Sequence, residues 1–232
     1  MTPDEQATLS KAIVSGEITP DVKVKVSALL QSADKPMQAW AAIAWGALAD
    51  HGHLPQGDAE TLRCAIASLV EIVRGGPDYH DYDDALEALC EACPLYDEAT
   101  YLFDPRSQAL AGLSALGPLA AEAVPVLVVL LAQWGDADGV RCGAAAALGA
   151  MAASKHGDAR LTDPRILEAL TRAVGDTTDN EGTVRDAVFS ALCDIGAPAR
   201  VAIPALEEAL TDLDNKFLFE RISETLAELR AS

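Results

Sequence analysis

The residues best suited to catalysis lie in one short stretch, 79–86, which reads YHDYDDAL. Carboxylates placed within one helical turn repel each other, so one of them can stay protonated at neutral pH and serve as a general acid. His80 adjoins Asp81, Asp83 and Asp84, and these side chains define a possible small catalytic site around His80–Asp84. The structural alternative is that Asp81 caps a helix and the next two aspartates occupy its first turn, where the helix dipole favours negative charge.

The sequence patterns that would indicate a metal or cofactor site are weaker than this candidate catalytic stretch. Cys90 and Cys93 lie close in sequence, as do His51 and His53, but a metal site needs further ligands that converge on the same point. The two cysteines also occupy positions of a helical pattern where other segments carry glycine and small residues, which favours a place in the core. The sequence has no glycine-rich phosphate loop, nucleophile elbow or cysteine–histidine signature. We therefore expect no metal and no cofactor.

The net charge narrows the remaining function classes. Asp and Glu outnumber Lys and Arg by 36 to 17 among 232 residues, which gives a formal charge of −19. A field of this sign repels phosphate backbones, so we expect no nucleic-acid partner.

The amino-terminal residues, the most apolar stretch and the cysteines indicate the cellular compartment. The first residues, MTPDEQATLSKAIVSGEITP, lack the basic start and apolar run of a signal peptide. The most apolar stretch, AVPVLVVLLAQW, is shorter than the roughly 20 residues of a membrane span. Five cysteines inside helical patterns fit reduced thiols. We expect a cytoplasmic protein without a membrane partner.

An internal repeat supplies the elements that would position any site. Three segments align without a gap and place Arg106, Arg141 and Arg185 in one column: PRSQALAGLSALG (105–117), VRCGAAAALGAMA (140–152) and VRDAVFSALCDIG (184–196). Three more fit the same template less well: MQAWAAIAWGALA (37–49), DYDDALEALCEAC (81–93) and LFERISETLAELR (218–230). Each segment follows another apolar helix pattern, so the repeating unit is a helical hairpin.

The valine–arginine pair, the columns of small residues and the closing glycine resemble the HEAT-repeat family, in particular the short bacterial HEAT-like repeats of phycobilisome lyase-type proteins. The resemblance implies an all-α fold, a right-handed α-solenoid of about six helical hairpins. It covers 18–232 as one domain, and 1–17 is expected to form an amino-terminal capping helix. The family includes scaffolds, adaptors, lyase subunits and a few enzymes, so it leaves the function open.

The repeat template also predicts which side chains face outward. With the first residue of each segment at position 0, positions 4, 5, 7, 8 and 11 go to the core and positions 2, 3, 6 and 10 share the opposite face. In HEAT-like arrays that face lines the concave side. The alanine-rich segment 140–152 makes the middle of this expected groove shallow. The candidate binding residues are Trp40, Ile43, Asp83, Asp84, Glu87, Glu91, Asp186, Asp194 and Glu224.

Such a groove suits a basic or amphipathic peptide, because apolar anchors supply affinity and complementary charge supplies orientation. We therefore expect a non-enzymatic, monomeric scaffold or adaptor that binds a protein or peptide. The alternative is an enzyme or a lyase-like accessory subunit that uses the carboxylates around His80–Asp84. Trp40 is either an anchor for the partner or already covered by the amino-terminal helix, and the acidic columns have the simpler interpretation of solvated faces.

The arginine column carries one structural expectation. In HEAT-like arrays this arginine reaches an acidic residue in a neighbouring turn between helices. The candidates for that role here are Asp104, Asp136, Asp138 and Asp179.

Overall fold

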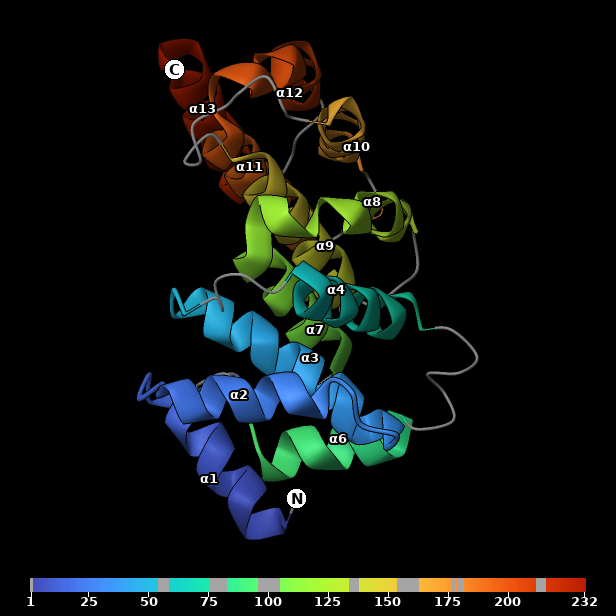
Figure 1. Cartoon of the computed structure of the whole chain (residues 1–232). Coiled ribbons are helices and arrows are strands. Elements are labelled where there is room, and N and C mark those ends of the chain that lie inside the picture. Colours follow the sequence, from blue (N-terminus) through green and yellow to red (C-terminus); the bar gives the residue numbers. More distant parts are fainter. Residues whose placement is uncertain are drawn as a thin grey trace. The chain divides into compact units, whose positions relative to one another are not determined.

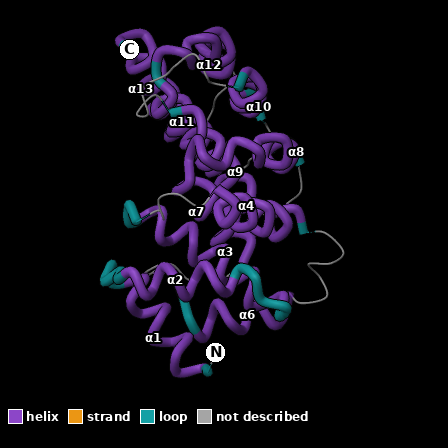
Figure 2. Tube along the Cα trace, in the orientation of Figure 1, coloured by secondary structure: helices purple, strands orange, loops and turns teal. Residues whose placement is uncertain are grey.

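A computed structural model of the protein describes residues 2–53, 59–75, 83–95, 105–133, 138–153, 163–176, 178, 182–211 and 216–232. Within these ranges every regular element is a helix and none is a strand, which confirms the predicted all-α class (Figure 2). The packing divides the chain into two compact units, Met1–Leu116 and Gly117–Ser232, called unit 1 and unit 2 below. The boundary expected near residue 17 lies inside unit 1.

Unit 1 consists of helices in its described part, and the first three of them begin with clear capping signals (Figure 1). Thr2, Thr19 and Asp34 each accept a backbone N–H from the first turn of the helix that follows, and each of these helices has proline in its first turn. The expected amino-terminal helix is present as the first of them. The helices are α1 (Pro3–Val14), α2 (Pro20–Leu29), α3 (Lys35–Asp50), α4 (Ala59–Arg74), α6 (Asp83–Ala92) and α7 (Pro105–Leu116).

Unit 2 contains two layers of helices (Figure 1). One layer is the stack α9, α11 and α13, and the other contains α8, α10 and α12, each packed against the stacked helix that follows it in the chain. This is the predicted hairpin pattern. The elements are the 3₁₀ segment η2 (Gly117–Ala123), α8 (Val124–Ala132), α9 (Asp138–Ala152), α10 (Pro164–Val174), α11 (Thr183–Ile195), the 3₁₀ segment η5 (Ala197–Ala202), α12 (Ile203–Thr211) and α13 (Lys216–Ala231).

The run Pro105–Ala132 is long and apolar enough to cross a membrane by length and composition, with a mean hydropathy of 2.1 in its most apolar window. It is not one regular helix. Gly117 has φ +53° and Ala120 has non-helical dihedrals, so the run breaks into α7, η2 and α8. Core helices of a folded protein have the same composition, and 44% of that window is buried.

Close backbone contacts define how the stacked helices follow one another. A Cβ added to Gly46 of α3 would lie 2.2 Å from the Cα of Gly112 in α7, and one added to Gly149 of α9 would lie 2.9 Å from the Cα of Ala191 in α11. Both pairs join position 9 of one repeat segment to position 7 of the next. The helix α7 therefore stacks on α3 in the same register as α11 stacks on α9. Small residues are required where the two backbones meet.

The side chain at position 1 shows which helices form hairpins. In α3, Gln38 donates a 2.8 Å hydrogen bond to the carbonyl of Leu30, eight residues earlier, at the end of α2. Arg106 and Arg141 make the same kind of bond, each 3.3 Å long, to a carbonyl near the end of α4 and α8 respectively. The donor and the acceptor residue of this bond are ten residues apart in the sequence for Arg141 but 33 residues apart for Arg106. Thus α4 pairs with α7, and the segment between them is an insertion.

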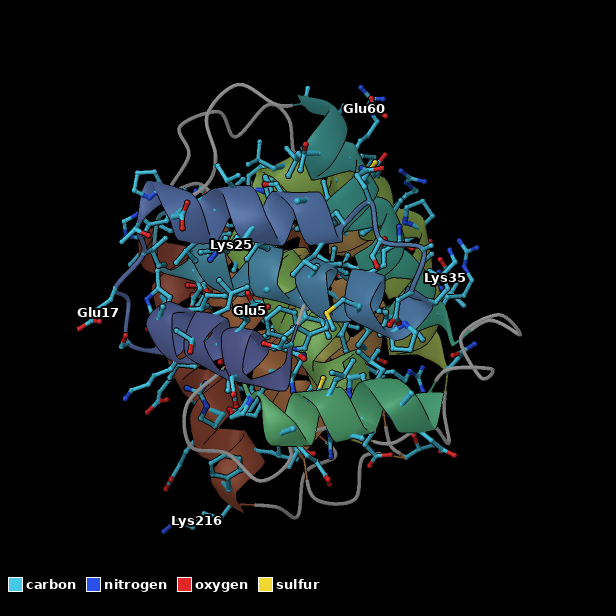
Figure 3. The ribbon with its side chains drawn as sticks, turned by 60° about the horizontal axis from the view of Figure 1, so that its bottom comes forward. Glu5, Glu17, Lys25, Lys35, Glu60 and Lys216 are labelled. Atoms are coloured by element: carbon cyan, nitrogen blue, oxygen red, sulfur yellow. The ribbon has the colours of Figure 1, made fainter. Side chains whose placement is uncertain are left out.

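The predicted second hairpin, with 81–93 as its stacked helix, is therefore wrong. Instead, α6 packs on α3, in contact with it but outside the stack (Figure 3). The physical reason is that a period of 3.6 residues marks any amphipathic helix and does not specify its neighbour. The near contact of Gly46 with Gly112 leaves no room for another helix between α3 and α7.

The expected contact between an arginine and an acid is present at Arg141, with an acid that sequence reasoning did not name. Both Arg141 and Asp176, which follows α10, are buried, and the guanidinium donates to the Asp176 carboxylate. Burial by itself raises the pKa of Asp176, but hydrogen bonds from Arg141 and Thr178 outweigh it and hold the pKa below its usual value. Of the acids expected instead, Asp104, Asp136 and Asp179 lie outside the described residues, as does the Asp138 side chain.

Candidate interaction surface

The two apolar residues expected to line a groove are buried. Trp40 and Ile43 have no exposed surface, and the indole Nε1–H of Trp40 donates a 3.2 Å hydrogen bond to the carbonyl of Cys93, just beyond α6. Their assignment to an open groove is wrong, because α3 is enclosed by α1, α2, α4, α6 and α7. Trp40 is therefore covered within unit 1, and its hydrogen bond places the segment just after α6 at its indole.

The carboxylates of α6 face away from those apolar residues. Asp84, Glu87 and Glu91 are exposed, whereas Leu86 and Cys90, on the opposite side of the same helix, are buried. The side chain of Asp83 lies outside the described residues. The predicted combination of an aromatic anchor and an acidic strip on one face therefore does not form in unit 1.

In unit 2 the side chains of the predicted outward columns reach the surface. Positions 2, 3, 6 and 10 of α9, α11 and α13 share one side of each helix by helical spacing, and every one of these residues is at least partly exposed. We call this surface the inner face of unit 2. It contains Cys142, Gly143, Ala146 and Ala150 of α9, Asp186, Ala187, Ser190 and Asp194 of α11, and Glu220, Arg221, Glu224 and Glu228 of α13.

Arg221 links the carboxylates of this face. Its Nε donates to Asp186 of α11, and its two terminal nitrogens reach Ser190 at 3.2 Å and Glu224 at 3.1 Å. The hydrogen bond to Asp186, followed in weight by that to Glu224, raises the pKa of the Arg221 guanidinium, against an opposing effect of burial. One cation is therefore held in a fixed position among several carboxylates, and the surface keeps a negative balance.

Cys193 lies on α11 next to Asp194 of this face, and its thiol has an environment that disfavours the reactive thiolate. Burial first, and then a hydrogen bond to Glu228, raise the pKa of its thiol to about 11. A thiol with that pKa remains protonated at neutral pH, so it is a poor nucleophile and a poor metal ligand.

Phe217 is a residue of this face that sequence reasoning missed. It lies one helical turn before Arg221, at the start of α13, and 51% of its surface is exposed. The signal was available, since four residues separate the two in the sequence, but the template began at position 0 and Phe217 precedes it. The inner face of unit 2 thus combines small residues on α9, acids on α11 and α13, and one exposed aromatic ring.

The candidate catalytic stretch around His80–Asp84 is largely outside the described part of the chain, and only Asp84 has a described, exposed side chain. Among the described residues, no three His, Cys, Asp or Glu side chains come together as metal ligands. A hollow between α8 and α10, beside Arg172 and Asp176, measures about 30 Å³, which is room for roughly one water molecule. A second, open hollow beside Leu167, Glu168 and Val201 measures about 500 Å³.

No protein-family model matches the sequence, and no curated protein matches it either. Among solved structures, a designed armadillo repeat protein is similar to this chain with a TM-score of 0.57 at 18% identity, covering 98% of this chain and 92% of that one. An engineered protein is also similar, at 20% identity and a TM-score of 0.43, covering 98% of this chain and 64% of that one. The first likeness concerns the fold alone: the chain is an all-α helical-repeat solenoid.

Proposed function

We propose that this solenoid is a non-enzymatic scaffold or adaptor that binds a basic or amphipathic protein segment on the inner face of unit 2. The observation that carries the proposal is the group of acids on α11 and α13, with Asp194, Glu224 and Glu228 exposed and Asp186 half-buried against Arg221. They lie beside small residues of α9 that offer a smooth apolar floor. Phe217 supplies the aromatic contact that the sequence led us to expect from Trp40.

The chemistry of the face specifies the partner. Exposed carboxylates attract lysine and arginine side chains and speed association, while apolar contact supplies the remaining affinity. The formal charge of −19 disfavours nucleic acid and anionic membrane surfaces as partners. We further propose a kinship with short HEAT-like repeats, a monomeric state and a cytoplasmic location.

The test uses two defined synthetic peptides rather than an unknown partner. One is a helix of about 20 residues, which spans about 30 Å, with leucines on one side and lysines on the other. The second has glutamates in place of the lysines. The lysine peptide should bind the full chain, and its affinity should fall as salt rises, because exposed charges are screened over about 8–10 Å at 0.1–0.15 M. Equal binding of both peptides, or binding independent of salt, would contradict the proposal.

A matched pair of triple variants locates the binding. The first triple variant removes three negative charges from the inner face of unit 2: Asp194→Asn, Glu224→Gln and Glu228→Gln. The second removes the same charge from exposed carboxylates on α2, α4 and α10: Asp21→Asn, Glu60→Gln and Glu168→Gln. We expect the first triple to weaken the lysine peptide about tenfold, from roughly 0.5 kcal/mol for each exposed pair, and the second about twofold. Equal losses would show that only net charge matters.

A further inference from the structure

In unit 1, α6 covers a surface of α3 whose counterpart in unit 2 is open. Trp40 and Ile43 occupy positions 3 and 6 of the repeat segment and are fully buried. The residues at position 6 in α9 and α11, Ala146 and Ser190, are exposed. Because the stacking register is the same in both units, the difference arises from what lies on α3 and not from a different orientation of the helix.

The contact between α6 and α3 has the form of a helix laid on a surface. Leu86, Cys90 and Cys93, spaced by four and three residues, form the buried stripe of the segment. Beyond α6, the Trp40 indole donates to the carbonyl of Cys93, and the Ser10 hydroxyl of α1 donates to the carbonyl of Pro94. Figure 3 shows α6 and α1 on one side of α3 and α2 on the other.

On its own, α6 is a poor helix. It has ten residues, DDALEALCEA, with no basic residue among them, and helices shorter than about 12 residues are marginal in water. Glu87 lies three residues after Asp84 and four before Glu91, so like charges are neighbours on its exposed side and oppose helix formation. The helix therefore depends on its contact with α3, and we expect its local release to cost less free energy than unfolding the whole unit.

We propose that the surface of α3 around Trp40 and Ile43 is a second binding site, for the amphipathic helix of a partner, and that α6 is its built-in occupant. The occupant shows what the site accepts: a segment with a leucine at position i and small, weakly polar side chains, here cysteines, at i+4 and i+7. A partner helix with lysines on its other side avoids the repulsion within α6 and is attracted by the acidic chain, so it displaces α6. This site is separate from the inner face of unit 2 and does not rest on its function.

Hydrogen exchange of the full chain tests whether α6 opens by itself. Backbone amides of Leu86 to Cys93 should exchange faster than those of the buried parts of α3 and α7, without a loss of total helicity. The same exchange rate in all three helices would mean that α6 leaves only when unit 1 unfolds, and the proposal would be overturned.

The probe for the site is a synthetic peptide of residues 83–95 carrying Asp84→Lys, Glu87→Lys and Glu91→Lys. At saturation it should increase deuterium uptake in α6 and leave α3 protected. The apparent association constant of the peptide is its intrinsic constant multiplied by the fraction of protein in which α6 is released. A change that weakens the docking of α6 raises that fraction, so it should tighten peptide binding. Binding without a change in α6 would place the peptide elsewhere and refute the proposal.

Two variants of α6 and one control variant in unit 2 make this competition measurable. Leu86→Ala removes a buried contact of α6 and should tighten the peptide at least tenfold, whereas Leu206→Ala, a buried leucine of α12 in unit 2, should leave the affinity unchanged. Ala88→Gly changes only an exposed position of α6 and should tighten binding about fivefold through lower helix propensity, even if Leu86→Ala fails to fold. Unchanged or weaker binding in the variants that fold would overturn the proposal.

Discussion

Replacing Arg141 with alanine should destabilise unit 2 strongly. The guanidinium and the Asp176 carboxylate are 2% and 1% exposed, so neither charge is screened by water, and Arg141 also donates to the carbonyl of Leu131. Removing one partner of a buried ion pair leaves the other charge uncompensated and typically costs about 3–5 kcal/mol. With a urea dependence of about 2 kcal/mol per molar, the midpoint should fall by roughly 1.5–2.5 M.

The assay is urea unfolding followed by circular dichroism, with hydrogen exchange to show that the loss is confined to unit 2. The control is Arg165→Ala, which breaks an exposed arginine–aspartate pair in the same unit and should cost less than about 1 kcal/mol. The double change Arg141→Met with Asp176→Leu should recover most of the loss, since it leaves no unpaired charge. A midpoint within about 0.5 M of the unchanged protein for Arg141→Ala would refute this reasoning.

The pH dependence supplies an independent check. The pKa of Asp176 is lower in the folded protein than its ordinary value of about 3.9, so its contribution to stability is present above that pH and is lost as the pH falls below it. In Arg141→Ala, burial without the guanidinium raises the pKa of Asp176. The gap in stability between the two proteins should therefore narrow as the pH falls from 7 to 3, and a constant gap would contradict the assignment.

Three further predictions concern packing and reactivity. Gly46→Ala places a methyl group against the backbone of α7 and should destabilise unit 1 by about 3 kcal/mol or more in urea unfolding, whereas Gly139→Ala, with open space around it, should be neutral or stabilising. Trp40→Phe removes the hydrogen bond to Cys93 and should cost about 1 kcal/mol, measured in the same way; no loss would mean that the bond adds nothing to stability. The Cys193 thiol, with a pKa of about 11, should be about one-thousandth ionised at pH 8, so mass-spectrometric labelling should stay slow there and rise roughly tenfold per pH unit; fast labelling at pH 8 would contradict its environment.

Much of the fold could be predicted from the sequence because periodicity, caps and glycine spacing are local properties. Segments 140–152 and 184–196 alternate small and apolar residues at 3.6-residue spacing, which sets their helical state and the face that packs. Helix starts such as Asp34 and Asp163 carry their own capping side chains. The exposed acids on α11 and α13 followed from the same spacing, and the structure has them on one face.

The identity of each helix's neighbour was decided by tertiary structure alone. The segment 81–93 has the amphipathic pattern of a stacked helix, but Gly46 and Gly112 bring α3 and α7 into contact, and α6 is left to cover α3. The same arrangement buried Trp40, which the sequence pattern alone had predicted to lie on an exposed column. A residue's direction from its helix axis is encoded locally, whereas its exposure depends on segments far away in the chain, because burial is a property of the whole packed unit.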